Sequence, residues 1–334
     1  METVLYNPPF SHIYVEGSAR GYPLTKQVLS AFPNARQIEI NHYKDVFCQK
    51  QHNFAAQKKS PSLILSKNGG RGLYKGSELC DSFGNEHFYY VNHMLNCLYD
   101  CEYCYLQGML PSAAVVIFVN PKAIYGEVTE LLKKHSMYVC VSYDTDLLAF
   151  EHITGFLSDW LEMTRTHEDL EIEIRTKSAA YNAIRRFRPV SNVVISWTVS
   201  PREITNRREH GAPGLTNRIS SINAALSDGW RVRICIDPIL YVENWQEHYM
   251  DLIVELQREI DLSAVHEFSI GTFRMPEAFL KKSIRLRPCS EIFSYPSFSH
   301  GKYSDADRKE LIDFVYHELL IRDAPNIKIR PGEL

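Results

Sequence analysis

The sequence predicts an α/β protein, built as a partial or full TIM-like (β/α) barrel with an N-terminal extension. After residue 86, apolar and β-branched runs of strand length recur along the chain, and stretches with helical period separate most of them. Strands that alternate with helices of this length indicate parallel βαβ units. Because periodicity cannot determine whether such a sheet closes, an open doubly wound sheet is the competing architecture. The expected strands cover residues 87–94, 114–119, 138–143, 170–175, 193–199, 231–238 and 267–273.

The helices expected between these strands carry recognisable signals. Asn120-Pro121 places a capping residue before a proline of the first turn, which opens a helix that should end near Lys134. Residues 1–85 instead mix short patterns with breakers such as Gly69-Gly70. We therefore expect an N-terminal extension over residues 1–85 and a barrel domain over residues 86–334. Further helices are expected over residues 24–31, 148–163, 179–186, 216–227, 245–260 and 306–320.

Composition and the N-terminus favour a cytoplasmic protein. The 334 residues are 45% hydrophobic and 23% charged, which is ordinary for a soluble globular chain. The sequence holds no apolar run of about eighteen uncharged residues, which argues against a membrane span. The first residues lack the basic start and apolar core of a secretory signal.

Charge is distributed unevenly along the chain. The net charge of −3 argues against binding a polyanion over the whole surface. Residues 181–240 nevertheless hold nine Arg against four Asp or Glu, and residues 271–290 hold five Lys or Arg against Glu277 alone. Such a local excess is either a solvated face or a surface on which a phosphate backbone docks.

The eight cysteines divide into a group of three and five that stand alone. In a cytoplasmic chain they are thiols or metal ligands rather than disulfides. The group has the spacing Cys-x3-Cys-x2-Cys directly after the first expected barrel strand: Cys97, Cys101 and Cys104. The five cysteines that stand alone are Cys48, Cys80, Cys140, Cys235 and Cys289. Isolated cysteines of this kind are usually small buried hydrophobic residues.

Three thiolates this close together predict a [4Fe–4S] cluster. They can bind three corners of one cube and leave the fourth iron without a protein ligand. S-adenosylmethionine binds at such a vacancy, and one electron then releases a 5′-deoxyadenosyl radical. A structural zinc site would need four ligands, usually in Cys-x2-Cys pairs, and a ferredoxin run would need more cysteines. The sequence therefore predicts a barrel of the radical S-adenosylmethionine type with both cofactors.

The segment around this group resembles the spore photoproduct lyase family, radical enzymes that revert a methylene-bridged thymine dimer in DNA. Residues 101–107, Cys-Glu-Tyr-Cys-Tyr-Leu-Gln, are similar to the family's Cys-His-Tyr-Cys-Tyr-Leu-Gln. The resemblance extends in order over about residues 85–320. Its further matches are Thr145-Asp146-Leu147, Glu151-His152-Ile153-Thr154, Thr176-Lys177, Ser196, Pro238-Ile239, Asn244-Trp245 and Gly301-Lys302-Tyr303.

The resemblance implies roles for the cofactor side of the site. Lys177, Ser196 and Thr145 would contact S-adenosylmethionine, and Tyr103 and Tyr105 would lie beside it and relay hydrogen back to 5′-deoxyadenosine. Other uses of these side chains stay open. A tyrosine next to a cluster can simply shield it from solvent, and a lysine at the end of a strand can pair with a carboxylate such as Glu173.

One departure concerns the hydrogen donor. The family carries a cysteine three residues before the aspartate matched by Asp146, and here that position is Tyr143. Along a strand, Cys140 and Tyr143 face opposite sides, so Cys140 replaces the missing thiol only if a bulge shifts the register. We expect Cys140 to be a buried strand residue. Tyr143 could itself supply hydrogen through its phenolic O–H, or the substrate differs.

The function that the resemblance implies is a lyase for DNA repair, acting on a UV-induced thymine lesion in damaged duplex DNA. Lys302 and Tyr303 would lie on the substrate side, and Arg207 and Arg208 would hold the DNA backbone. A donor such as flavodoxin or ferredoxin would supply the electron. The family's substrate-side Arg-Tyr pair is absent, with Ser297-Phe298 near its place.

Two other functions stay open. One is a radical S-adenosylmethionine enzyme for another substrate, such as a nucleoside, a peptide or a metabolite. The other is a redox sensor that keeps the cluster without turnover. Lys177 and Ser196 argue against the sensor, because a sensor needs no S-adenosylmethionine pocket.

Overall fold

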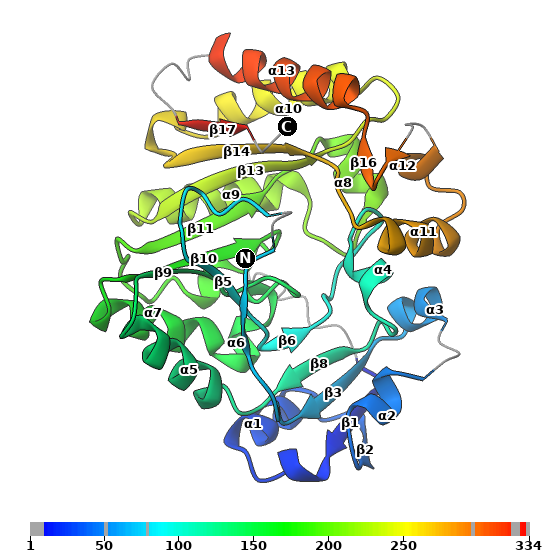
Figure 1. Cartoon of the computed structure of the whole chain (residues 1–334), viewed down its shortest axis with the longest axis vertical. Coiled ribbons are helices and arrows are strands. Elements are labelled where there is room, and N and C mark those ends of the chain that lie inside the picture. Colours follow the sequence, from blue (N-terminus) through cyan, green and yellow to red (C-terminus); the bar gives the residue numbers. More distant parts are fainter. Residues whose placement is uncertain (1–9, 50–52, 78–79, 295–297, 322–327, 332–334) are drawn as a thin grey trace. The chain divides into compact units, whose positions relative to one another are not determined.

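The structure is a computed structural model that describes residues 10–49, 53–77, 80–294, 298–321 and 328–331 (Figure 1). The chain divides into two compact units. Unit 1 comprises Met1–Leu98, Met109–Arg175 and Asn182–Val193, and unit 2 comprises Tyr99–Gly108, Thr176–Tyr181 and Val194–Leu334. The expected boundary near residue 85 does not coincide with this division and stays a prediction. No helix of the described chain is both long and apolar enough to cross a membrane.

One sheet of unit 1 is built largely from the N-terminal residues. Its strands run in the order β2-β1-β3-β8-β6, and all neighbours pair in parallel except β6 and β8. The strand expected over residues 114–119 lies here as β8, beside β3, and not in a barrel sheet. Its run of four buried residues indicates a covered strand without indicating its partner. The strands are β1 (His12–Glu16), β2 (Arg36–Ile40), β3 (Ser62–Ser66), β6 (Met94–Leu95) and β8 (Val115–Phe118).

The other strands of unit 1 follow the order β10-β9-β5-β4. Three of them pair in parallel, whereas β4 is antiparallel to β5. Helices connect β8 to β9 and β9 to β10, as the alternation of strands and helices predicts. The single helix expected over residues 148–163 is wrong, because Gly155, in the left-handed region at φ 69°, separates α6 from α7. The elements are β4 (Leu73–Lys75), β5 (Phe88–Val91), β9 (Met137–Cys140), β10 (Leu170–Thr176), α5 (Lys122–Leu132), α6 (Glu151–Thr154) and α7 (Phe156–Thr166).

Unit 2 contains parallel strands in the order β11-β13-β14-β17. Helices α10 and α13 lie side by side over β14 (Figure 1), where the rings of Trp245 and Phe314 meet edge to face at 5.1 Å. Each strand and helix expected in this part of the chain is found within a few residues of its predicted limits. The elements are β11 (Val193–Thr198), β13 (Arg231–Ile239), β14 (Glu267–Thr272), β17 (Ile329–Pro331), α9 (Leu215–Ser227), α10 (Trp245–Glu259) and α13 (Asp305–Ile321).

Two predictions for short helices have opposite outcomes. The helix expected over residues 24–31 is confirmed as α1 (Pro23–Ala31). The helix expected over residues 179–186 is wrong, because only a 3-10 turn, Tyr181–Ala183, forms there. The hydroxyl of Thr176 accepts the N–H of Ser178, and the hydroxyl of Ser178 accepts the N–H of Ala180. Local bonds of this kind offer the backbone an alternative to a helix.

Shorter elements complete the described chain. These shorter elements are α2 (Lys44–Phe47), α3 (Phe54–Lys59), β7 (Asp100–Cys101), α4 (Leu106–Met109), α8 (Arg202–Arg208), β12 (Glu209–His210), α11 (Glu277–Leu286), α12 (Glu291–Ser294), β15 (Phe298–Ser299) and β16 (Lys302–Tyr303). Of these, β7, β12 and α4 lie around the cysteine group, and the hairpin of β15 and β16 carries Lys302 and Tyr303.

Candidate active site

The cysteine loop is the segment that carries Cys97, Cys101 and Cys104. It includes β7 and is followed by α4. Within unit 2, β7 pairs antiparallel with β12, and the N–H of Glu102 donates to the carbonyl of Arg208 at 2.8 Å. The N–H of Cys104 donates to the carbonyl of Cys101 at 3.0 Å and closes a turn between these two cysteines. Cys101 is buried and Cys104 half-buried. Cys97 is half-buried in unit 1, where its carbonyl accepts the Lys58 ammonium at 2.7 Å.

The carboxylate of Glu102 fixes this loop to other parts of unit 2. It accepts the hydroxyl of Ser290 at 2.5 Å, and it lies 3.0 Å from His210 Nε2 and 3.4 Å from Arg208 Nη1. Arg208 also reaches Glu291 at 2.5 Å. The Arg208 side chain is 16% exposed, so this residue, expected to hold DNA, is instead paired with the Glu102 carboxylate of the cysteine loop.

A buried polar cluster lies behind Tyr103. Its O–H donates to Glu209, which also accepts the hydroxyl of Ser200 at 3.0 Å and forms an ion pair with buried Arg218. Burial disfavours the carboxylate charge, but Arg218 and Lys177 outweigh it and lower the pKa of Glu209. Burial, and then the neighbouring Glu209 charge, raise the pKa of Tyr103 well above its usual value. Tyr103 is therefore a neutral hydrogen-bond donor whose ring is fixed in place.

Lys177 faces the same cluster. Its ammonium lies 5.3 Å from the centroid of the Tyr103 ring, within the range of a cation–π contact. Burial disfavours its charge, yet Cys101 and Glu209 outweigh burial and raise the pKa of Lys177. The alternative partner considered for Lys177, the Glu173 carboxylate, accepts Arg175 at 3.3 Å. A charged lysine is thus held beside Tyr103 and near the cysteine loop.

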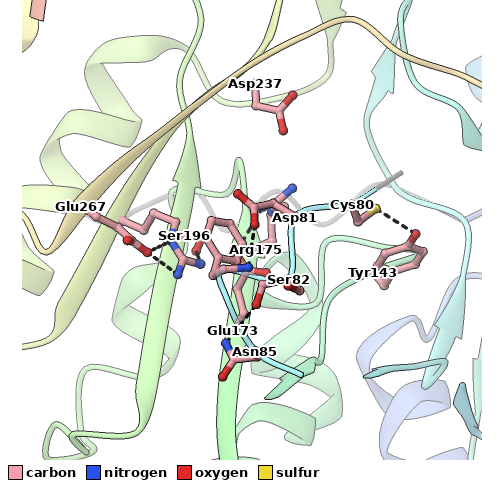
Figure 2. Close-up of polar contacts among 12 residues, drawn as sticks. Cys80, Asp81, Ser82, Asn85, Tyr143, Glu173, Arg175, Ser196, Asp237 and Glu267 are labelled. Atoms are coloured by element: carbon pink, nitrogen blue, oxygen red, sulfur yellow. Dashed lines mark hydrogen bonds and ion pairs between the residues drawn. The ribbon is translucent and has the colours of Figure 1, made fainter. Parts of the chain in front are cut away.

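The other two residues expected to contact S-adenosylmethionine differ in their surroundings. Ser196 is fully buried, and its hydroxyl accepts Arg233 at 3.2 Å, next to the ion pair that Arg233 forms with Glu267 (Figure 2). Thr145 is also buried, but its hydroxyl oxygen has no hydrogen-bond partner within the described parts of the chain. A buried hydroxyl without a partner is rare, and it fits a side chain that awaits a bound group.

Tyr143 and Cys140 border the same apolar cluster. Cys140 is buried with Phe83, Phe88 and Tyr138, and Tyr143 packs against this cluster together with Cys80 and Tyr90. The strand β9 ends at Cys140, so the alternation rule that placed the two residues on opposite sides does not reach Tyr143. That expectation is corrected, whereas the buried strand position of Cys140 is confirmed. The Tyr143 hydroxyl lies 3.1 Å from Cys80 Sγ (Figure 2).

The substrate-side residues include one that is structural. Tyr303 is buried, and its hydroxyl accepts the N–H of Tyr241 at 3.2 Å. Lys302 is half-buried in β16, after a turn where a Cβ at Gly301 would lie 1.8 Å from the Met275 carbonyl oxygen. Phe298 opens β15, and Ser297 lies outside the described residues.

Arg207 is exposed, whereas Tyr105 is half-buried like Lys302. The Arg207 side chain is 66% exposed and pairs with Glu203 at 2.9 Å. Tyr105 is half-buried directly before α4, and its carbonyl accepts the N–H of Gly108 at 3.0 Å.

The donors on this chain fit a [4Fe–4S] cluster rather than a single metal ion. Among the described residues, no three His, Cys, Asp or Glu side chains gather closely enough to hold one ion. A [4Fe–4S] cluster needs a different arrangement of ligands, because each cysteine thiolate binds its own iron and the cysteine sulfur atoms therefore lie apart from one another. Three cysteines within eight residues and a charged lysine near Cys101 agree with a cluster. In unit 1, the Thr145 hydroxyl, which has no partner among the described residues, agrees with a bound polar group.

Comparison with models of protein families shows which family this chain belongs to. The model of the spore photoproduct lyase family matches residues 7–283. The chain belongs to this family. Spore photoproduct lyase of Clostridium acetobutylicum is 22% identical over 329 residues, which cover 93% of this chain and 95% of that protein. Spore photoproduct lyases are radical S-adenosylmethionine enzymes that carry a [4Fe–4S] cluster.

Solved structures of spore photoproduct lyase show the same fold. A complex with dinucleoside spore photoproduct superposes with a TM-score of 0.83 at 17% identity, covering 97% of this chain and all of the other. A variant with bound AdoMet and dinucleoside spore photoproduct superposes with a TM-score of 0.81 at 19% identity, covering 96% and 99%. The expected α/β fold of the radical S-adenosylmethionine type is therefore confirmed.

Several residues of the site escaped the sequence analysis. In the sequence, Glu209 and Arg218 contributed only to the charge balance of residues 181–240, and Cys80 was interpreted as an isolated cysteine. Tyr103 precedes Glu209 by 106 residues, and Cys80 precedes Tyr143 by 63. No local pattern links residues so far apart. The substitution of Glu102 for the family's histidine was the one available signal that the cysteine loop has its own ionic support.

Proposed function

We propose that this protein repairs a methylene-bridged thymine dimer in DNA by radical S-adenosylmethionine chemistry. The observation that carries the proposal is the pairing of Lys177 with Tyr103 on the cysteine loop, in a member of the spore photoproduct lyase family. A sensor that only held a cluster would not need a charged, half-buried lysine beside that loop. Lys177 has the charge that a cofactor carboxylate requires.

The cofactors would be held by residues on both sides of this lysine in the sequence. Cys97, Cys101 and Cys104 would bind the [4Fe–4S] cluster, and Lys177, Ser196 and Thr145 would contact S-adenosylmethionine. When bound, these cofactors supply the 5′-deoxyadenosyl radical, which removes hydrogen from C6 of the bridged thymine so that the methylene bridge opens. A reduced flavodoxin or ferredoxin would supply the electron.

Protein residues would then position groups and return hydrogen. Tyr103, fixed by Glu209, and Tyr105 would border the cofactor and relay hydrogen. Tyr143, held against Cys80 and Tyr90, would border the product radical. Because burial, and then Cys80, raise the pKa of Tyr143, its hydroxyl keeps its hydrogen at neutral pH. Tyr143 thus holds a transferable hydrogen where the family has a thiol.

The substrate would be damaged duplex DNA, as the family's solved complexes with dinucleoside spore photoproduct suggest. The lesion must leave the base stack to reach a buried site. Arg207 is exposed enough to meet a phosphate, and Lys281, paired with Glu277 at 2.6 Å, is 64% exposed. Arg208 would act on DNA only indirectly, because it supports the cysteine loop. Lys302 would lie near the substrate, and Tyr303 would support the hairpin that carries it.

A cytoplasmic location belongs to the same proposal. No disulfide links any of the eight cysteines. Thiols in this number, with a cluster that oxygen destroys, suit a reducing compartment. Fractionation of the native cells, with the protein followed by antibody, would test this location.

A second candidate is a radical S-adenosylmethionine enzyme for another substrate. The observation that favours it is Tyr143 in the place of the family's donor cysteine. A nucleoside, a peptide or a metabolite whose product radical needs no thiol would agree with that substitution. The cofactor chemistry would be unchanged, and only the substrate would differ.

One assay separates the two candidates. The protein is reconstituted anaerobically with iron and sulfide, reduced, and given S-adenosylmethionine with spore-type DNA that has or has not been irradiated. We expect irradiated DNA to raise 5′-deoxyadenosine formation and to yield repaired thymine by mass spectrometry. Cys48→Ala serves as the matched control for an exposed cysteine outside the group. Release of 5′-deoxyadenosine with the lesion left intact would favour the second candidate.

A further inference from the structure

We propose that Cys80 is the thiol that donates hydrogen to the product radical, and that Tyr143 restores it. The inference rests on the proposed function and adds a residue to it. The family places its donor thiol at the position of Tyr143, which here carries a phenol. The structure nevertheless brings a thiol to that phenol from another part of the chain.

The contact is specific in its geometry. Cys80 Sγ lies 3.1 Å from the Tyr143 hydroxyl oxygen, and Figure 2 shows the two groups directed toward one another. On its other side, the Tyr143 ring stacks on Tyr90 with centroids 4.2 Å apart and planes inclined by 23°. Burial raises the pKa of Tyr90 to about 12, so this neighbour is neutral as well. The stacked ring holds the phenol oxygen against the sulfur atom.

Cys140 is the other thiol near Tyr143, and its surroundings suit packing. It is 3% exposed within a cluster of Phe83, Phe88 and Tyr138. Cys80 is half-buried and lies at the edge of that cluster. A thiol that meets a substrate radical must reach the substrate, and a sulfur atom enclosed by aromatic rings cannot do so without unpacking them. Cys80 therefore has the better position for transfer.

Hydrogen atoms balance over the proposed sequence. A C–H bond forms on the thymine methyl group as the Cys80 S–H bond breaks, which leaves a thiyl radical. The thiyl takes the hydrogen atom of the Tyr143 O–H, which restores the S–H bond and leaves a phenoxyl radical. The hydrogen atom that the substrate gave up at the start, carried on 5′-deoxyadenosine, returns to the phenoxyl oxygen, so that a C5′–H bond breaks, the O–H bond re-forms and the 5′-deoxyadenosyl radical would be regenerated. Only hydrogen atoms are exchanged, so no external oxidant or reductant is needed.

A single-turnover experiment in D2O shows whether an exchangeable protein group is the donor, because S–H and O–H exchange with solvent and C–H does not. Comparison of Cys80→Ala with Tyr143→Phe then distinguishes the thiol from the phenol. In the wild-type enzyme we expect one deuterium in the methyl group of the first thymine formed. Cys80→Ala should lose this product by about tenfold or more at the first turnover, while 5′-deoxyadenosine still forms. Tyr143→Phe should give a deuterated first product within about twofold of wild type and then stall, because the thiyl is not restored.

The outcomes separate the inference from the proposed function. A wild-type enzyme that repairs no lesion counts against the proposed function. A Cys80→Ala enzyme that makes deuterated thymine at the wild-type rate overturns the role of Cys80. So does a Tyr143→Phe enzyme that fails at the first turnover while Cys80→Ala succeeds, since the phenol would then be the direct donor. Cys48→Ala, at an exposed thiol, should match wild type throughout.

A second measurement needs no cofactor. In the iron-free protein, iodoacetamide should alkylate Cys80 more slowly than the exposed Cys48 and Cys289, as read by peptide mass spectrometry. Tyr143→Phe should raise the rate at Cys80 by about threefold, as expected for the loss of one hydrogen bond, and leave the rate at Cys48 unchanged. An unaltered rate at Cys80 would show that the contact does not form in solution and would overturn the inference.

Discussion

The phenol of Tyr103 donates to the carboxylate of Glu209, 106 residues further along the chain. The same carboxylate forms an ion pair with Arg218, and neither of these two side chains is exposed to solvent. Glu209 lies in β12, which pairs with β7 on the cysteine loop. One buried charge pair therefore fixes both the ring beside the proposed cofactor and the strand that carries Cys101.

Removal of the Glu209 charge should destabilise the protein strongly. Glu209→Gln leaves the Arg218 charge buried without its partner, which typically costs about 3–5 kcal/mol of unfolding free energy. Glu203→Gln, at the exposed pair with Arg207, should cost less than about 1 kcal/mol. Urea denaturation of the iron-free variants measures both. Equal costs at the two sites would show that the buried pair contributes no more than a surface pair.

The Glu209 carboxylate should make the stability of the protein depend on pH. Although burial opposes its charge, Arg218 and Lys177 hold the folded-state pKa of Glu209 below the reference value of 4.5. A lowered pKa means that the stabilisation is present above about pH 4.5 and is lost as the pH falls through the folded-state value. The wild type should therefore lose unfolding free energy below that pH more steeply than Glu209→Gln. Parallel curves would contradict the assignment of a charged Glu209.

The cysteine group should account for all bound iron. Anaerobic reconstitution should give one cluster of about four irons per chain. We expect Cys97→Ala, Cys101→Ala and Cys104→Ala each to abolish it, as measured by iron content and absorbance. Variants of four of the five other cysteines should retain it, namely Cys48→Ala, Cys80→Ala, Cys235→Ala and Cys289→Ala. A second cluster, or iron kept in all three group variants, would contradict the ligand set.

Lys177→Ala should weaken the binding of S-adenosylmethionine while the cluster remains intact. Loss of a half-buried charge that pairs with a ligand carboxylate should raise the dissociation constant by about tenfold or more. Isothermal titration of the reconstituted protein measures the affinity, and the absorbance spectrum reports the cluster. Lys281→Ala, at a lysine that is 64% exposed, is the matched control. Unchanged affinity in Lys177→Ala would remove this residue from the pocket.

Binding to duplex DNA should weaken steeply as salt increases. Each phosphate contact contributes about one unit to the slope of log affinity against log salt. Arg207→Glu and Lys281→Glu should each flatten that slope, because both side chains are exposed. Arg208→Glu should instead disturb the cysteine loop through Glu102 and lower the iron content. Salt-independent binding would favour a substrate other than DNA.

Tyr143→Phe and Cys140→Ala should affect different properties. Tyr143→Phe deletes only the hydroxyl, so cleavage of S-adenosylmethionine should continue while repair slows or yields side products. Cys140→Ala should cost about 1 kcal/mol of stability through the loss of a buried side chain and leave the products unchanged. Product analysis after many turnovers and urea denaturation measure the two effects. Diverted products from Cys140→Ala alone would make Cys140 the donor.

The sequence by itself determined the features that depend on neighbouring residues. Helix α10 follows the 3.6-residue pattern predicted over residues 245–260, and its observed limits are Trp245–Glu259. The cysteine spacing and the matches from Cys101 to Tyr105 are also local, and they indicated the family that the comparison with family models confirmed. Patterns of this kind survive because they reflect hydrogen bonding and ligand spacing within one stretch of chain.

Only the tertiary structure decided which distant residues meet. The run at Val115–Phe118 predicted a buried strand, yet its neighbour β3 follows from the packing of the whole sheet. Arg208 was expected to bind DNA on its charge alone, whereas the fold pairs it with Glu102. The contact of Cys80 with Tyr143 joins the segment between β4 and β5 to the residues that follow β9. Contacts of this kind depend on strand order and burial, and no periodicity in the sequence records them.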